Sequence, residues 1–100
     1  MIKYLEKEQK LEDALTNDDT VVVFSATWCG PCQLLAETLE EYLKTEKANI
    51  IKIDIDQHPE EAKNYGIMVV PTIMLFKNKE KIKQETGYLD TSELAKFINN

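Results

Sequence analysis

The chain of 100 residues has two cysteines, Cys29 and Cys32, which stand two residues apart at the boundary between two contrasting segments. The segment before them, 20–25, is short, apolar and rich in β-branched residues, which is typical of a strand buried on both faces of a parallel sheet. In the segment after them, 35–43, apolar and charged residues recur with the period of an amphipathic helix. The cysteine pair is therefore predicted to lie where a central strand passes into a helix.

The rest of the chain predicts an α/β protein in which strands and helices alternate. A segment at 50–56, where isoleucine alternates with polar residues, completes a βαβ unit with the strand and the helix around the cysteines. Asn78 and Lys79 are predicted to form a hairpin turn without glycine, and Asp90 with Glu93 a capping box. Further strands are expected at 2–5, 72–77 and 81–86, and further helices around 11–15, over 59–63 and after residue 90.

Charge and hydropathy exclude several classes of protein. Lysine and arginine number 12 against 18 aspartates and glutamates, and the net charge of −6 repels the phosphates of nucleic acid. A membrane span needs roughly 18 consecutive apolar residues, and the sequence contains no such run. Residues 1–7 contain no apolar signal segment. With 43% hydrophobic residues, positions 1–100 are expected to form one domain, monomeric and cytoplasmic.

The spacing of the cysteines favours chemistry over bracing. In the cytoplasm thiols are kept reduced, so a Cys-x-x-Cys pair is catalytic or metal-binding rather than structural. A bridge that closes four residues would contribute only about 2 kcal/mol before strain, against about 3 kcal/mol for a loop of roughly fifteen residues. A structural zinc site normally has four ligands, and the chain offers only His58 besides the two cysteines. Redox chemistry is therefore the favoured interpretation, and no metal is expected.

The position of each sulfur predicts its role. A thiol at the N-terminus of a helix has a lowered pKa, because unpaired backbone N–H groups and the helix dipole favour the thiolate. Cys29 precedes the helix and is predicted to be the accessible nucleophile, whereas Cys32 lies one turn inside and is predicted to be the more buried, resolving thiol. Gly30 lets a substrate backbone approach closely, and Pro31 stiffens the turn between the sulfurs.

These residues resemble the active site of the thioredoxin family, and the likeness covers nearly the whole chain. It begins at Trp28-Cys29-Gly30-Pro31-Cys32 and continues through Asp54-Ile55-Asp56-Gln57-His58-Pro59, Tyr65-Gly66-Ile67, Val70-Pro71-Thr72, Phe76-Lys77-Asn78 and Gly87. The resemblance implies the thioredoxin fold, an α/β structure whose central mixed sheet of about five strands, or of four, is flanked by about four helices.

The resemblance also implies an activity and a set of partners. Members of the family reduce disulfides of protein substrates by dithiol–disulfide exchange and bind no cofactor. A flavoprotein of the thioredoxin-reductase type, which uses NADPH, recharges them. The segment Val70-Pro71-Thr72 matches the family's cis-proline loop, which lies against the cysteines, and proline is the residue that makes a cis bond accessible. The implied substrate-docking surface comprises Trp28, Gly30, Val70, Pro71 and Gly87.

One departure from the family pattern concerns proton transfer. Many thioredoxins carry a buried acid on the central strand behind the second cysteine, and this chain has Val23 at that position. The acid is usually assigned to proton transfer at the resolving sulfur, so that assignment fails here, and water is the substitute that we consider. Lys52 matches the family's partner of the acid, although composition alone predicts a solvated lysine. We therefore expect a resolving step that is slower, or shifted to higher pH, than in family members that carry the acid.

Two other functions remain open from the sequence. A binding or scaffold module would hold a partner on a surface formed by Trp28 and by Met68 to Pro71, with its cysteines idle. A dedicated oxidase or isomerase would use the same two sulfurs in another direction. The proline between the cysteines, Pro31, favours the reducing direction by family likeness.

Overall fold

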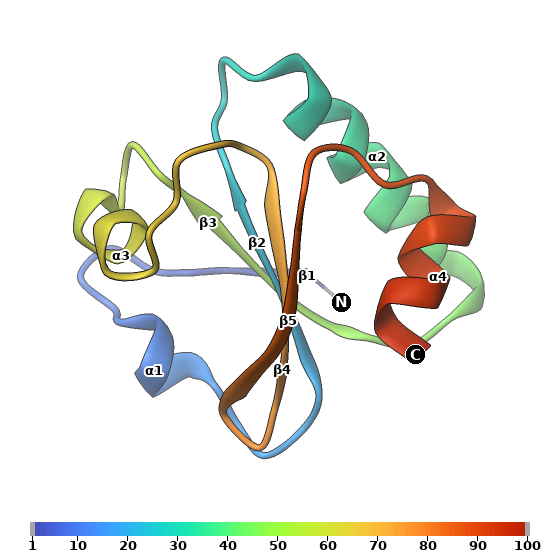
Figure 1. Ribbon diagram of the computed structural model, residues 1–100, viewed down its shortest axis with the longest axis horizontal. Coiled ribbons are helices and arrows are strands. Elements are labelled where there is room, and N and C mark those ends of the chain that lie inside the picture. Colours follow the sequence, from blue (N-terminus) through green and yellow to red (C-terminus); the bar gives the residue numbers. More distant parts are fainter. Residues whose placement is uncertain (1, 100) are drawn as a thin grey trace.

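The structure is a computed structural model that describes residues 2–99, and a mixed sheet forms its centre (Figure 1). Its five strands are β1 (Ile2–Tyr4), β2 (Thr20–Ser25), β3 (Asn49–Asp54), β4 (Thr72–Lys77) and β5 (Glu80–Thr86). Their order across the sheet is β1-β3-β2-β4-β5, with β1, β3 and β2 parallel and β4 and β5 antiparallel to their neighbours. The predicted central strand is confirmed as β2.

Helices cover both faces of the sheet within residues 2–99. They are α1 (Leu11–Ala14), α2 (Gly30–Thr45), α3 (Pro59–Asn64) and α4 (Thr91–Asn99). Figure 1 shows α2 and α4 on one face and α1 and α3 on the other. The α/β architecture expected from the sequence, a mixed sheet flanked by helices, is therefore confirmed. None of the helices in this described part is long and apolar enough to cross a membrane.

The side chains of β2 alternate between two hydrophobic cores. Val21 and Val23 pack on the face of α2 and α4, whereas Val22 and Phe24 pack on the opposite face with Leu11 of α1. All residues of β2 are buried. The continuous apolar run in the sequence follows from this position, because a strand covered on both faces has no side exposed to water.

The third strand ends at Asp54, two residues earlier than the predicted end at 56. The Asp54 carboxylate Oδ1 accepts a hydrogen bond from the backbone N–H of Asp56 at 2.8 Å, and the Asp54 carbonyl accepts from the N–H of His58 at 2.9 Å. Such aspartate turns compete with the extended conformation. They stop β3 with Asp54 paired to Ser25, the last residue of β2.

Two local predictions from the sequence are confirmed by backbone geometry. Asn78 and Lys79 join β4 to β5 with φ angles of 52° and 68°, the left-handed pair of a two-residue hairpin turn. At the start of α4, the Glu93 N–H donates to Asp90 Oδ1 at 2.8 Å, and the Asp90 N–H donates to Glu93 Oε1 at 3.1 Å. These reciprocal bonds are a capping box and fix where the last helix begins.

Buried polar side chains fasten the loops on the face that carries α1 and α3. Glu61 accepts a hydrogen bond from the Leu11 N–H at 2.8 Å, and the His58 ring Nε2 donates to the Leu5 carbonyl at 3.0 Å. His58 is the N-cap residue of α3. Its ring contributes to the anchoring of the segment after β1 and does not reach the cysteines.

Candidate functional site

The cysteine motif lies in the connection between β2 and α2, at one end of the sheet (Figure 1). The segment that enters β4 and the segment that leaves β5 reach the same end of the sheet in this view. Three parts of the chain that are far apart in the sequence therefore meet around the cysteines.

Cys29 is the N-cap residue of α2, and Cys32 lies in the first turn of that helix. The backbone N–H of Cys32 donates to Cys29 Sγ at 3.2 Å, so an amide that has no partner within the helix points at this sulfur. The two sulfurs form a disulfide, with the Cα atoms 5.2 Å apart. The prediction that the pair stands at a strand–helix junction is confirmed.

Both cysteines are buried, with 6% of Cys29 and 3% of Cys32 exposed. Their order of exposure is the predicted one, but Cys29 is much less accessible than the sequence led us to expect. The reason is a small apolar cluster in which Ala26 packs with both cysteines, while Ile55 and Val70 cover it from other segments. A partner must therefore reach Cys29 at the rim of this cluster.

The loop that enters β4 lies against the first sulfur. Its Val70–Pro71 peptide bond is cis, as the family resemblance implied, and the Val70 carbonyl oxygen lies 3.6 Å from Cys29 Sγ. The Gly87 N–H donates to the Pro71 carbonyl at 2.8 Å, and Gly87 has a φ of 88°, which favours glycine. The structure thus brings Cys29, Val70, Pro71 and Gly87 together, while their role in docking a substrate stays a prediction.

Trp28 projects from the surface beside the motif. It is 67% exposed, and its indole Nε1 donates to Asp56 Oδ2 at 2.8 Å. Asp56 lies in the turn after β3, and the sequence assigned it no role, because only the pairing of β2 with β3 brings the two residues together. The hydrogen bond orients a large exposed ring at the edge of the site.

The two residues between the cysteines fit the start of α2. Pro31 lies in its first turn, where the missing N–H breaks no helical hydrogen bond. A Cβ atom added at Gly30 would meet no other atom within 4 Å, so packing inside the chain does not require glycine there. The space above Gly30 is open to an approaching backbone.

Exposed apolar side chains surround the disulfide. Besides Trp28, the loop before β4 presents Met68 with 94% and Val69 with 54% of its surface exposed. Patches of this kind on a small protein mark sites where another molecule docks. A role of residues 68–70 in docking a partner stays a prediction.

Lys52 and Val23 are paired in register on β3 and β2. Val23 is 1% exposed and belongs to the apolar core beneath α2, so the acid that many family members carry there is replaced by hydrocarbon packing. Lys52 is half-buried, and its Nζ lies 5.7 Å from the centre of the Tyr4 ring. The lysine is thus more confined than composition suggested, and it faces the interior side of the cysteine loop.

A cavity of about 450 Å³ lies between Cys32 and the end of β3. Its lining combines Cys32 with the polar residues Ser25, Thr27, Gln33, Lys52, Asp54 and Gln57, and with Tyr4, Ala26 and Ala36. This cavity was not predictable from the sequence, because four separate segments contribute to its wall.

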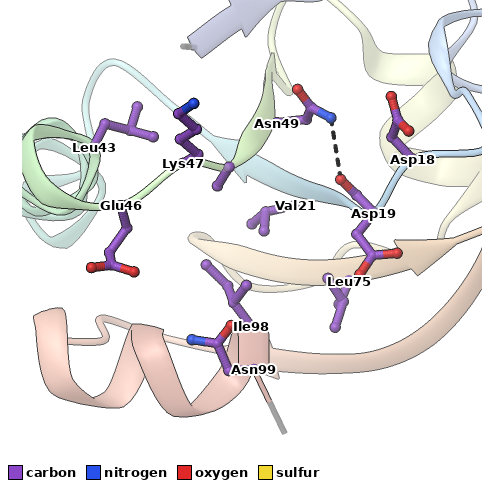
Figure 2. Close-up of a pocket in the computed structure, with 11 residues that line it drawn as sticks. Asp18, Asp19, Val21, Leu43, Glu46, Lys47, Asn49, Leu75, Ile98 and Asn99 are labelled. Atoms are coloured by element: carbon purple, nitrogen blue, oxygen red, sulfur yellow. Dashed lines mark hydrogen bonds between the residues drawn. The ribbon is translucent and has the colours of Figure 1, made fainter.

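A larger cavity, of about 600 Å³, lies elsewhere, between the end of α2, the starts of β2 and β3, and the end of α4 (Figure 2). The close-up shows Asp18, Asp19 and Glu46 around apolar residues such as Val21 and Ile98. It contains no cysteine and none of the predicted site residues. We therefore place the chemistry at the smaller cavity and the disulfide.

Comparison with known proteins gives a consistent result. The family model described as Thioredoxin matches residues 2–100. The thioredoxin of Rickettsia bellii is 40% identical over 92 residues, covering 89% of this chain and 88% of that protein. The thioredoxin of Alicyclobacillus acidocaldarius is 37% identical over 90 residues, covering 87% of this chain and 86% of its own length.

Solved structures agree with these sequence relatives. The reduced thioredoxin pre-protein of Schistosoma mansoni superimposes with a TM-score of 0.87 at 33% identity, covering 97% of this chain and 94% of that one. The fold, the disulfide at the start of α2 and the sequence relatives together support thiol–disulfide exchange at Cys29 and Cys32 on disulfide-containing proteins. The chain belongs to the thioredoxin family.

Proposed function

We propose that the chain works in the reducing direction, with Cys29 as nucleophile and Cys32 as resolving thiol. The observation that supports Cys29 as the nucleophile is the hydrogen bond from the Cys32 N–H to Cys29 Sγ at the N-terminus of α2. Backbone N–H groups and the helix dipole stabilise a thiolate at that position. Cys29 also lies nearer the surface than Cys32, so it meets a substrate first.

The proposed reaction transfers two electrons and two protons to the substrate. The Cys29 thiolate attacks one sulfur of a protein disulfide, forming a mixed disulfide and releasing the other substrate sulfur as a thiolate that takes up a proton. Cys32 then loses its proton and attacks Cys29 Sγ. The bond between Cys29 and the substrate breaks, the second substrate thiolate is protonated, and the chain is left with the Cys29–Cys32 disulfide.

The substrate would lie across the exposed rim of the site. Trp28, Met68 and Val69 offer exposed apolar surface, and the loop at Val70 and Pro71, which lies against Cys29, offers backbone groups. An unfolded or extended peptide around a disulfide suits such a rim, because its own backbone can approach the open space above Gly30. Gly87 supports the loop by its hydrogen bond to Pro71.

The proposal includes a source of electrons outside the chain. A flavoprotein of the thioredoxin-reductase type would use NADPH to reduce the Cys29–Cys32 disulfide, and the chain itself would bind no cofactor. The cytoplasm suits this cycle, since thiols there are kept reduced. We propose that the chain is a monomer, because the exposed side chains of Trp28, Met68 and Val69 then stay free to contact substrates.

The activity is tested by reduction of insulin disulfides with dithiothreitol as electron donor. The native chain should accelerate the reaction catalytically, with many turnovers per molecule, because the two sulfurs are recycled. A sample whose reduced cysteines have been alkylated should give the rate of dithiothreitol alone. Equal rates for the native and the alkylated chain would instead favour the redox-idle binding module.

The direction is tested by the reduction potential of the Cys29–Cys32 pair. We expect a value near the roughly −270 mV of thioredoxin rather than the roughly −120 mV of a strong oxidase or the roughly −180 mV of an isomerase. Equilibration with glutathione or dithiothreitol redox buffers, followed by alkylation and mass measurement, gives the potential. A value near that of the isomerase or oxidase would overturn the reducing direction while leaving thiol–disulfide exchange intact.

A further inference from the structure

The resolving step poses a proton-transfer problem in this chain. Cys32 must lose its proton before it can attack Cys29, yet it is only 3% exposed. The position on the central strand where many family members carry an acid holds Val23, whose side chain accepts no proton. A base must therefore reach the thiol from another direction.

The cavity behind Cys32 supplies that direction. Its volume of about 450 Å³ exceeds the roughly 30 Å³ that a water molecule occupies in the liquid, and polar side chains in its wall, among them Ser25, Thr27 and Gln57, offer hydrogen bonds to water. The titratable side chains around it are Tyr4 of β1, Cys32 of α2, and Lys52 and Asp54 of β3. Tyrosine and lysine side chains ordinarily hold their protons at neutral pH, whereas a carboxylate does not.

We propose that Asp54 is the proton acceptor for Cys32 during resolution, through water in this cavity. This inference rests on the proposed role of Cys32 as the resolving thiol. Asp54 is half-buried and ends β3 beside Ser25, the residue from which the chain turns toward the cysteines. Its carboxylate and Cys32 line the same cavity.

Lys52 contributes the electrostatics of this arrangement. Residues i and i+2 of a strand project from the same face, so Lys52 and Asp54 both line the cavity on the side of α2. The Tyr4 ring, 5.7 Å from Lys52 Nζ, confines the ammonium group. A positive charge placed there favours a thiolate at Cys32, but it accepts no proton itself.

The atoms of the step balance. The Cys32 proton passes through water to the Asp54 carboxylate, and the resulting thiolate forms the bond to Cys29 Sγ. The bond between Cys29 and the substrate sulfur breaks, and the released thiolate takes up a proton from Asp54 or from solvent. Asp54 returns to its carboxylate form, so it is unchanged over the cycle.

Two variants of Asp54 separate a base from a structural residue. Asp54→Asn keeps the oxygen that accepts the Asp56 N–H at 2.8 Å, but it removes the base. Asp54→Glu keeps a carboxylate at the cavity but disturbs that short turn. The proposal predicts that resolution is slower in the Asn variant than in the Glu variant, whereas a purely structural role predicts the reverse order.

The measurement is stopped-flow reaction of the reduced chain with dithiobis-nitrobenzoate, a symmetrical aromatic disulfide. Attack by Cys29 releases the first coloured thiolate, and resolution by Cys32 releases the second. In Asp54→Asn the second phase should slow by about tenfold near neutral pH, and its pH profile should move to higher pH, while the first phase is unchanged. An unaltered second phase, or equal slowing of both phases, would overturn the proposal.

A matched variant controls for the loss of one negative charge. Asp19 lies at the start of β2, away from the cysteine loop, where its carboxylate is 3.8 Å from Lys77 Nζ and exposed. Asp19→Asn should leave both phases as in the native chain, and slowing equal to that of Asp54→Asn would contradict a local base. The probe is not a protein, so this result is independent of whether the chain reduces insulin.

Discussion

Replacing Cys32 by serine should turn the chain from a catalyst into a trap. Cys29 still attacks a substrate disulfide, but no second thiol displaces the product, so the mixed disulfide persists. The backbone N–H at position 32, which donates to Cys29 Sγ at 3.2 Å, is kept by serine, and the nucleophile should stay activated. We expect one covalently bound partner per chain and an insulin reduction rate no greater than that of dithiothreitol alone.

The trap is measured by incubating reduced Cys32→Ser with disulfide-containing proteins and separating the adducts without reductant. Adducts should disappear when dithiothreitol is added. Cys29→Ser is the matched control, because it keeps one thiol but places it inside the helix, where only 3% of Cys32 is exposed. As many adducts on Cys29→Ser as on Cys32→Ser would contradict the assigned order of attack.

The fold was predictable to the extent that its causes are local. The apolar run of β2, the left-handed pair Asn78 and Lys79, and the capping box of Asp90 with Glu93 each act within a few residues, and each is found where the sequence placed it. The end of β3 was misplaced because strand alternation continues through 56, whereas the Asp54 side chain turns the backbone earlier. Alternation alone does not reveal such competition between side chain and strand.

The site was predictable in its sulfurs but not in its surroundings. Cys29 and Cys32 are separated by only two residues, and their place at the start of a helix follows from the periodicity of the residues after them. The hydrogen bond between Trp28 and Asp56 depends on the pairing of β2 with β3 and on the turn that follows. The contact of Val70 with Cys29, at 3.6 Å, also joins segments about forty residues apart, and only the family resemblance led us to expect it.

The cavity behind Cys32 shows which groups lie near the resolving thiol in a chain that has valine at position 23. The sequence identified Val23 as a departure but could not say what else lies near the resolving thiol. The structure places Lys52 opposite Val23 and Asp54 opposite Ser25, one step nearer the cysteine loop along the same face. A carboxylate thus borders the cavity, although position 23 in the apolar core beneath α2 holds valine.

Replacing Val23 by aspartate should destabilise the fold by about 3 kcal/mol near pH 8. Val23 is 1% exposed among core residues that include Leu35 and Leu39 of α2. Burial disfavours the charged carboxylate and therefore raises its pKa in the folded state. Lys52, paired with position 23, offsets part of this penalty.

The pH dependence of that loss follows from the sign of the pKa shift. In the unfolded chain the new carboxyl ionises near pH 4, whereas the folded chain keeps its proton to higher pH. Stability should therefore fall as pH rises from about 4 and level off above the folded pKa.

Val23→Asn, which has a similar shape and no charge, should show a loss that is independent of pH. Thermal unfolding of both variants at about pH 5 and about pH 8 checks this, with a Tm lower by roughly 15 °C for Val23→Asp near pH 8. Equal losses for both variants at both pH values would contradict a charge penalty.

Val23→Asp should also accelerate the resolving step, which we expect to be slow with valine at this position. A buried acid with a raised pKa is an effective base near neutral pH, because a base is most effective when its pKa lies near the working pH. In Val23→Asp the second thiolate release should therefore shift to lower pH, and adding Asp54→Asn should have little further effect. An additive slowing in the double variant would show that the two carboxylates do not serve the same proton. Valine at position 23 thus favours a stable core, and the resolving proton is left to the carboxylate at the cavity.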